Sequence, residues 1–349
     1  SRRRHTRCLS DWSSDVCSSD LVACFFDIEK AFDKMCHEEF VLKAKKAGIL
    51  DDTVGLMLNY LSGRSIRLRI NGVLSEPVTL RAGTPQGSIL SPTLFGIWVS
   101  DLPAPPPGVR VSQFADDIGV WASGRTADSA IAKLEDYCPV MVEWCRMCKI
   151  LLSASKTQVI AFRKDRADPG PIYIMLDGER IESSNEATFL GVVLDPQLTL
   201  VKHHAKITKE LRRRLGMLRG IAGSPLKPRA PSDMCSQIVR SMIEPVCTYA
   251  ASVTVVRKEH MFREQDLYLT RAYRVALHGP KTLSSQYVRA QVGLGDTRDT
   301  TIRLARDYVF SPERSGSFQR VLAELVQRER RAASSPRYPS PLRVLGLGQ

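Results

Sequence analysis

The sequence lacks several features that mark other protein classes. Its apolar runs are all far shorter than the roughly 20 residues that a membrane-spanning helix needs, and we find no internal repeat. Its nine cysteines are an odd number at irregular spacing, unlike the disulfide framework of a small secreted domain. No leader with an apolar core is recognisable. We therefore expect an intracellular globular protein with free thiols and no membrane partner.

Acidic residues are also few relative to basic ones. The 349 residues include 50 Lys and Arg against 37 Asp and Glu, which gives a net charge of +13. A basic chain favours a polyanionic partner, and nucleic acid is the first candidate. A basic protein without such a partner is the alternative that charge alone leaves open. The length and the 43% hydrophobic content are sufficient for two or three subdomains with a real core.

A CxxC pair, Cys145 and Cys148, is the one cysteine motif with metal-ligand spacing. A zinc site would need further ligands nearby, and the histidine pair that begins at His203 is remote in the sequence. The cysteines also lie in a segment, residues 135–149, whose pattern predicts a helix interrupted near Pro139. We interpret them as structural thiols rather than metal ligands.

Three aspartates carry the strongest chemical signal. Asp116 and Asp117 occupy a tight bend between two apolar strands, and Asp27 ends the apolar run of residues 21–26. Carboxylates gathered near a sheet repel one another unless a cation holds them. Two-metal phosphoryl transfer requires such a site, so the pattern indicates nucleotidyl transfer. Taken alone, the Asp116-Asp117 pair would be read as a solvated turn.

Periodicity and turn signals predict the order of the elements. Helices are predicted over residues 29–47, from 51 or 52 to 61, from about 91, and over 126–149. Strands are predicted over residues 21–26, 65–70, 73–80, 157–162, 172–176 and 188–194. Asn71-Gly72 predicts a hairpin turn, and Asp51 or Asp52 is predicted to cap the second helix.

The chain divides into four predicted regions. Residues 1–20 have no period of 2 or 3.6 and resemble translated sequencing-adapter DNA, so we predict a non-native leader; a disordered basic arm that binds nucleic acid is the alternative. After Asp195 the sequence becomes helical and basic. We therefore predict a first folded region over residues 21–194, a helical region over 195–310 and a basic, partly disordered tail over 311–349.

Five motifs give the chain a family resemblance. They lie at residues 26–33, 83–88, 114–117, 155–157 and 189–191. Their order and spacing resemble those of reverse transcriptases, above all those of non-LTR (LINE-like) retrotransposons. The resemblance implies an α+β fold: a polymerase palm with an antiparallel sheet and packed helices, followed by a helical basic thumb. Because only the predicted leader precedes the first strand, we expect the fingers to be largely missing.

The resemblance also implies a reaction, RNA-directed DNA synthesis. Asp27, Asp116 and Asp117 would hold two Mg²⁺ ions, with Mn²⁺ as an alternative, while a primer 3′-hydroxyl attacks the α-phosphate of a dNTP. Lys156 matches a family lysine near the triphosphate, where it could neutralise charge or protonate the leaving pyrophosphate. A solvated surface lysine is the alternative.

Three further residues would contact the nucleotide. Phe32 lies five residues after Asp27, where the family carries a ring that packs under the sugar and excludes a 2′-hydroxyl. Gln86 and Gly87 would face the incoming nucleotide and the template base. The alternatives are a core phenylalanine and an ordinary loop that enters a helix.

Two segments would contact the primer and the duplex. By resemblance, Phe189, Leu190 and Gly191 form the hairpin that grips the primer end; a buried strand with a bulge glycine is the alternative. The thumb would track the duplex backbone through electrostatic contacts. Its predicted contact residues are Lys202, Lys206, Lys209, Arg212 and Arg213.

Two more acids, Glu29 and Asp33, lie close to Asp27 in the sequence. Four residues apart on a helix, they would share a face and repel modestly. We predict that neither is a metal ligand.

The expected partners are an RNA template, a DNA primer and dNTPs. The expected location is intracellular, and nuclear at the step of genomic integration if the element is active. The alternative function is a truncated, inactive retroelement remnant that still binds nucleic acid. An RNA-dependent RNA polymerase is disfavoured by the aromatic Phe32.

Overall fold

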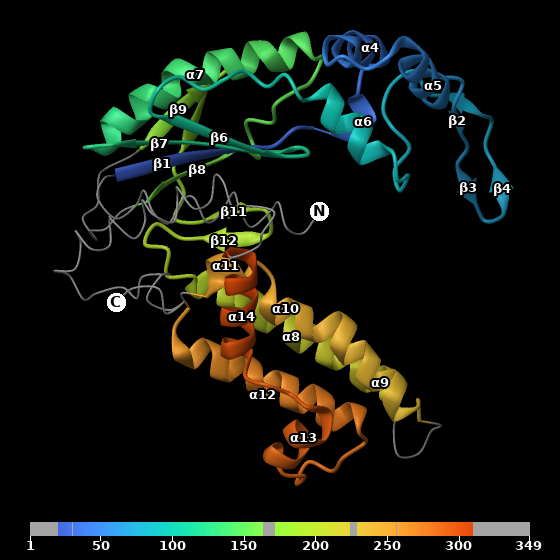
Figure 1. The fold of residues 1–349 in the computed structure, drawn as a ribbon, viewed down its shortest axis with the longest axis vertical. Helices are drawn as coiled ribbons and strands as arrows, with labels where there is room; N and C mark the ends of the chain where they lie inside the picture. The colour runs from blue at the N-terminus through green and yellow to red at the C-terminus, as the bar shows by residue number, and fades with distance from the viewer. Residues whose placement is uncertain (1–19, 30, 163–171, 224–228, 256, 310–349) are drawn as a thin grey trace. The chain divides into compact units, whose positions relative to one another are not determined.

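The computed structural model describes residues 20–29, 31–162, 172–223, 229–255 and 257–309 (Figure 1). The predicted tail lies outside these residues, as does the predicted leader apart from Asp20. The described chain forms two compact units, residues 20–190 and 191–309, which we call the sheet unit and the helical unit.

A four-stranded antiparallel sheet organises the sheet unit. Its strands run in the order β6 (Val109–Phe114), β7 (Asp117–Gly124), β1 (Asp20–Phe26) and β8 (Gln158–Phe162). β1 pairs on both edges and is buried from Leu21 onwards, which explains its continuous apolar sequence. The sequence placed this strand correctly except for its first residue, because Asp20 already pairs with β7.

One long helix, α7 (Ala127–Met147), packs against the sheet (Figure 1). Thr126 begins it with a capping box, as its sequence position allows. The predicted interruption near Pro139 is wrong, because the helix continues through the proline. Buried residues on both sides of it, including Tyr137 and Met141, hold the two halves on one core and offset the hydrogen bond that proline cannot donate.

The helix predicted over residues 29–47 is broken in two. The structure has α3 (Ala31–Lys34) and α4 (His37–Lys46), separated by extended backbone. At the break, the carbonyl oxygens of Phe32 and Met35 each accept a hydrogen bond of 2.8 Å from backbone N–H groups of the loop before α6. Those carbonyls therefore serve a long-range contact instead of the next helical turn.

The next helix, α5 (Asp51–Leu61), has the predicted extent but not the predicted cap. Leu50 occupies the N-cap position, and no side chain caps the helix. Asp51 and Asp52 lie in the first turn, where a carboxylate interacts favourably with the helix dipole. Asp51 also forms a surface ion pair of 2.8 Å with Lys45.

The predicted hairpin is present as a two-part ribbon that extends away from the sheet (Figure 1). Its strands are β2 (Ser65–Ile66), β3 (Arg69–Ile70), β4 (Val73–Leu74) and β5 (Val78–Thr79). Asn71 and Gly72 both have positive φ, as a tight hairpin turn requires. The predicted turn is therefore confirmed. The strands are exposed on both faces.

The remaining elements of the sheet unit are α6 (Ser91–Trp98) and three short strands. The strands are β9 (Tyr173–Leu176), β10 (Glu179–Glu182) and β11 (Ala187–Phe189). The single strand predicted over residues 188–194 is wrong. β11 ends at Phe189, and β12 (Val192–Leu194) begins after Leu190 and Gly191, both of which have positive φ.

The helical unit is built from helices around an apolar core. After β12 they are α8 (Val201–Ala222), α9 (Ser232–Ile238), the π-helix η1 (Val239–Ile243), α10 (Glu244–Thr248), α11 (Ala251–Thr254), α12 (Glu259–Ala276), α13 (Ser285–Val292) and α14 (Thr297–Val309). α8 and α12 make the most extensive contact and bury Leu211, Leu215 and Leu269. In the part of the chain that the structure describes, no helix has the length and apolar character needed to cross a membrane.

The CxxC cysteines are buried, as the structural interpretation predicts. All seven described cysteines are free thiols. Cys145 and Cys148 are at most 2% exposed, and the Cys148 sulfur accepts a hydrogen bond of 2.8 Å from Lys43. Burial raises the pKa of Cys145 to about 12, so this thiol stays protonated at neutral pH.

Candidate active site and nucleic-acid surface

Strand pairing brings the catalytic candidates to one end of the sheet. In the β1–β7 register Phe26 faces Ile118, so Asp27 follows the last paired residue of β1 and Asp117 precedes its partner on β7. Asp116 lies in the two-residue turn that joins β6 to β7. Backbone hydrogen bonds between strands thus bring residues that are far apart in the sequence to the same end of the sheet.

One face of the sheet leads to these carboxylates. Phe25 and Gly119 form a cross-strand pair, and side chains two residues apart share a face, so Asp27 and Asp117 belong to that same face. Phe189 covers it: its ring stacks on Phe25 with centroids 4.7 Å apart. A Cβ atom on Gly119 would lie only 3.0 Å from the Phe189 ring, so glycine is what permits this packing.

Phe189 is 2% exposed, and this burial bears on the primer-grip prediction. A ring enclosed in the core cannot offer its face to a primer, so for this side chain the geometry favours the alternative of a buried strand residue. The turn residues Leu190 and Gly191 follow it directly. The primer-grip role stays a prediction, and the turn residues Leu190 and Gly191 would have to make the primer contact.

Lys156 forms an ion pair with the first catalytic candidate. Its Nζ lies 3.4 Å from an oxygen of Asp27, and the two side chains are 64% and 45% exposed. An ion pair this exposed contributes little to stability, so Lys156 can exchange partners at small cost. The Asp27 backbone is held more firmly, because its carbonyl oxygen accepts a hydrogen bond of 2.9 Å from Ser153 N.

The three carboxylates have the donor chemistry of a magnesium site. Mg²⁺ takes hard oxygen ligands and keeps phosphate and water in its shell, which suits solvent-accessible aspartates at a sheet end. Asp27 and Asp116 are half-buried and Asp117 is exposed. Among the described residues, no three His, Cys, Asp or Glu side chains converge to hold a metal ion, so the coordination stays a prediction.

The nucleotide-contact candidates lie in α3 and in the loop before α6. Phe32 is half-buried and stacks on Phe95 with ring centroids 4.4 Å apart, so one face packs on the core as the alternative reading expects. Gln86 and Gly87 are exposed in the loop before α6. The Gln86 amide donates a hydrogen bond of 2.9 Å to Asp33, a contact that sequence reasoning missed.

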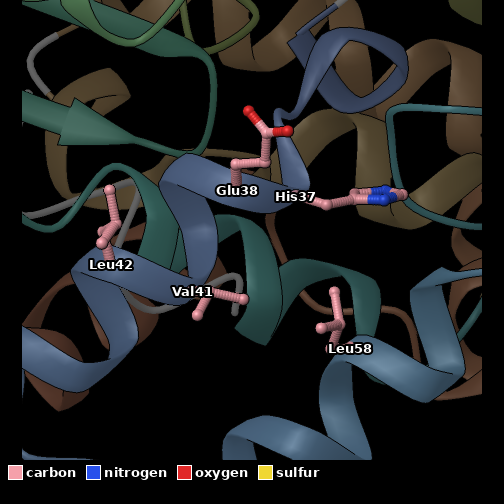
Figure 2. A pocket seen from close by; sticks show the side chains of 5 residues that line it. All are labelled: His37, Glu38, Val41, Leu42 and Leu58. Carbon is pink, nitrogen blue, oxygen red and sulfur yellow. The ribbon is translucent and has the colours of Figure 1, made fainter.

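Two hollows in the described chain lie away from these residues. Figure 2 shows the first, a cavity of about 390 Å³ beside α4, where Leu42, Val41 and Leu58 surround an apolar space next to His37 and Glu38. The second, of about 660 Å³, lies in the helical unit between η1 and the start of α14. Neither is lined by a predicted site residue.

The comparison with protein families decides the identity. Residues 3–194, more than half of the chain, match the family described as reverse transcriptase (RNA-dependent DNA polymerase). The chain belongs to the reverse transcriptase family. The match begins inside the predicted leader and contains every site candidate of the sheet unit.

Curated relatives of this reverse transcriptase chain come from fruit-fly mobile elements, which confirms the resemblance to non-LTR retrotransposon polymerases. A probable RNA-directed DNA polymerase from transposon X-element of Drosophila melanogaster is 32% identical over 207 residues, or 58% of this chain and 22% of the relative. The polymerase from mobile element jockey of Drosophila funebris is 24% identical over 323 residues, or 90% of this chain and 34% of the relative. The chain thus spans about a fifth to a third of the length of these relatives.

Among solved structures, telomerases from Candida tropicalis are similar to this chain. One, in complex with a fragment of telomeric RNA, has a TM-score of 0.40 and 12% identity, covering 91% of this chain and 51% of that one. A truncated apo telomerase has a TM-score of 0.39 and 14% identity, covering 54% of this chain and 38% of that one. The palm assignment rests on the family match and the antiparallel sheet.

Beyond the family match, α8 arranges cations in a single stripe. At 100° per residue, Lys202, Lys206, Lys209 and Arg213 lie within roughly 60° of one another, directly opposite the buried face of the helix. All four side chains are exposed. A stripe of this kind suits a phosphate backbone, which presents regularly spaced charges.

The other arginines of α8 are oriented differently. Arg212 lies to one side and donates a hydrogen bond of 3.2 Å to the Tyr268 hydroxyl. Arg214 is half-buried and donates a hydrogen bond of 2.6 Å to Glu210, which also binds Arg213. These bonds from Arg213 and Arg214 lower the pKa of Glu210 to about 2. The three consecutive arginines therefore point in different directions, and Arg212 lies outside the cation stripe.

Proposed function

We propose that this chain carries the palm of an RNA-directed DNA polymerase that adds dNTPs to a primer 3′-hydroxyl on an RNA template. The observation that supports it most is the pairing of β1 and β7, at whose shared end Asp27 and Asp117 lie next to the paired residues Phe26 and Ile118, in a chain of the reverse transcriptase family. Adjacent carboxylates at a turn between paired strands are what nucleotidyl transfer needs.

Asp27, Asp116 and Asp117 would hold the divalent cations. Bound Mg²⁺ would activate the 3′-hydroxyl and stabilise charge on the attacking and leaving oxygens. The three side chains are accessible to solvent, and their oxygens suit Mg²⁺ or Mn²⁺ in kind.

Lys156 would act on the triphosphate. Its ammonium already lies 3.4 Å from Asp27 as an exposed pair, so an incoming polyanion can attract it at little cost. There it would neutralise phosphate charge and could donate a proton to the leaving pyrophosphate.

Phe32 would select deoxynucleotides by steric contact with a 2′-hydroxyl. Its stacking on Phe95 fixes the ring against the core, so the ring edge that stays accessible is rigid. Gln86 and Gly87 lie in the exposed loop that would face the nucleotide.

The cation stripe of α8, formed by Lys202, Lys206, Lys209 and Arg213, would contact the template–primer duplex. Such contacts are independent of sequence and sensitive to salt. The polymerase would act inside the cell and, in an active element, in the nucleus when the copy is integrated. Retention of duplex binding without polymerase activity defines the alternative, an inactive retroelement remnant.

Primer extension tests the proposal. The purified chain is incubated with an RNA template, a DNA primer, dNTPs and Mg²⁺, beside the variant Asp116→Asn, which keeps the side-chain volume and removes the charge. We expect extension by the parent and a loss of at least a thousandfold in the variant, with duplex affinity unchanged within about twofold. Equal extension by both would reject the assigned site. Duplex binding without extension by either would favour the inactive remnant.

A further inference from the structure

The loop before α6, which carries Gln86, and the segment that contains α3 are joined by hydrogen bonds. Thr84 N donates to the carbonyl oxygen of Phe32, and Gly83 N donates to that of Met35, both at 2.8 Å. One side-chain bond accompanies them: Gln86 Nε2 donates to Asp33 Oδ1 at 2.9 Å. Asp33 is one of the two acids near Asp27 that the proposed reaction leaves without a role.

We propose that Asp33 is a positioning residue that fixes the orientation of the Gln86 carboxamide toward the incoming nucleotide. The inference rests on the proposed function, because it assigns a nucleotide contact to Gln86. It goes further in naming the atom that makes this contact and the residue that selects it.

The selection follows from the chemistry of the two groups. An ionised carboxylate can only accept hydrogen bonds, whereas a carboxamide has a donor end and an acceptor end. Asp33 therefore binds the Nε2 end of Gln86 and leaves Oε1 as the outward acceptor. Oε1 would accept a hydrogen bond from a hydroxyl or amino group of a deoxynucleoside triphosphate. Without Asp33, the amide could rotate by half a turn and present a donor instead.

The backbone around Asp33 is fixed tightly enough for this role. A Cβ atom on Gly83 would lie 2.6 Å from the Asp33 carbonyl oxygen, so the two segments are in direct backbone contact. The Gly83 carbonyl oxygen lies 2.9 Å from His37 Nε2 and also accepts a hydrogen bond from Arg64. The loop and α3 are thereby held together, whereas the side chains of Asp33 and Gln86 are exposed.

Variants that exchange donor and acceptor test the proposal. Asp33→Ala removes the acceptor, and Gln86→Glu places two carboxylates together. Asp33→Asn combined with Gln86→Glu rebuilds the bond with reversed polarity, because the introduced amide donates and the introduced carboxylate keeps an outward oxygen. The measurements are kcat and KM for dATP in primer extension, and equilibrium binding of a fluorescent dATP analogue to the chain.

We expect Asp33→Ala to raise KM and the dissociation constant about tenfold while kcat stays within about twofold of the parent value. Gln86→Glu should raise KM and the dissociation constant at least as much. The double variant should return to within about threefold of the parent. Parent-like nucleotide affinity in Asp33→Ala, or no recovery in the double variant, overturns the inference while the polymerase assignment stands. A parent chain that neither extends primers nor binds the analogue overturns the proposed function and this inference together.

Discussion

The sheet unit and the helical unit assemble their candidate functional residues in different ways. In the sheet unit, Asp27 and Asp117 come from distant parts of the chain and lie at the same sheet end because β1 and β7 pair in one register. In the helical unit, the cation stripe comes from a single helix, α8, through its 3.6-residue period. The first arrangement depends on a few backbone contacts that must all form. The second is a set of separate charges, so each charge removed should weaken nucleic-acid binding by a further step.

The largest effect is expected from a substitution that breaks the backbone contact between Gly83 and Asp33 in the sheet unit. Gly83 has a φ of +81°, and a Cβ atom there would lie 2.6 Å from the Asp33 carbonyl oxygen. Gly83→Ala should therefore lower the free energy of unfolding by about 3 kcal/mol, from backbone strain and displacement of Asp33. Urea unfolding measures this loss.

Gly87→Ala is the matched control. Gly87 has a φ of +85° in the same loop, but nothing lies within 4 Å of a Cβ atom there. Its loss should be limited to the strain of a positive φ, about 1 kcal/mol. Equal losses in the two variants would show that the close approach to Asp33 contributes nothing.

The next effect is a pH dependence that belongs to the helical unit. His203 is buried, and burial, followed by the charge of Arg257, lowers its pKa from 6.5 to about 3. Between these values the unfolded chain binds the proton and the folded chain does not, so stability falls as pH drops below about 6.5. By pH 5 this group alone should cost about 2 kcal/mol.

Urea unfolding at pH 7 and pH 5 measures that cost. His203→Asn keeps an acceptor near the position of Nδ1, which Val193 N approaches at 3.3 Å, and should remove the slope due to this residue. His260→Asn, at an exposed position of the same unit, is the control and should leave the slope unchanged. An unaltered slope in His203→Asn would contradict the assignment.

The graded character of the cation stripe can be tested with pairs of substitutions on one helix. The double variant Lys206→Gln/Lys209→Gln removes two cations from the stripe. The double variant Arg212→Gln/Arg219→Gln removes two cations that lie beside the stripe on the same helix. The first pair should weaken duplex binding about tenfold near 0.1 M salt and reduce the salt slope by about 2. The second pair should weaken binding about threefold or less. Fluorescence anisotropy across a salt series measures both, and equal losses would mean that the stripe does not define the contact surface.

Much of the sheet unit could be predicted from sequence because its signals are local. The apolar run of β1, the turn at Asn71-Gly72 and the aspartates beside apolar strands all lie where the sequence placed them. The break between α3 and α4 could not be foreseen, because its cause is a pair of hydrogen bonds from the distant loop at Gly83 and Thr84. Residues 29–47 have an uninterrupted helical pattern, and tertiary contacts override it.

The site residues also divide into those that local sequence signals predict and those that depend on distant contacts. Sequence motifs predicted Asp27, Asp116 and Asp117, and strand pairing brings them to one end of the sheet. The role of Asp33 in holding Gln86 could not be predicted, because an aspartate on a short helix gives no sign of a partner far along the chain. Burial of Phe189 likewise depends on Gly119, which leaves room for the ring.

A glycine-to-alanine substitution in each unit should change the free energy of unfolding in opposite directions, and this is the sharpest test of the comparison. Gly119→Ala places a Cβ atom 3.0 Å from the Phe189 ring, which must shift against Phe25, so the sheet unit should lose about 1 kcal/mol. Gly216→Ala lies on the exposed face of α8 with nothing within 4 Å, so it should gain about 0.5–1 kcal/mol from helix propensity. Thermal unfolding of the two variants beside the parent measures both changes. If both variants were destabilised alike, α8 would depend on close contacts as the sheet does, and its charges could no longer be treated as independent.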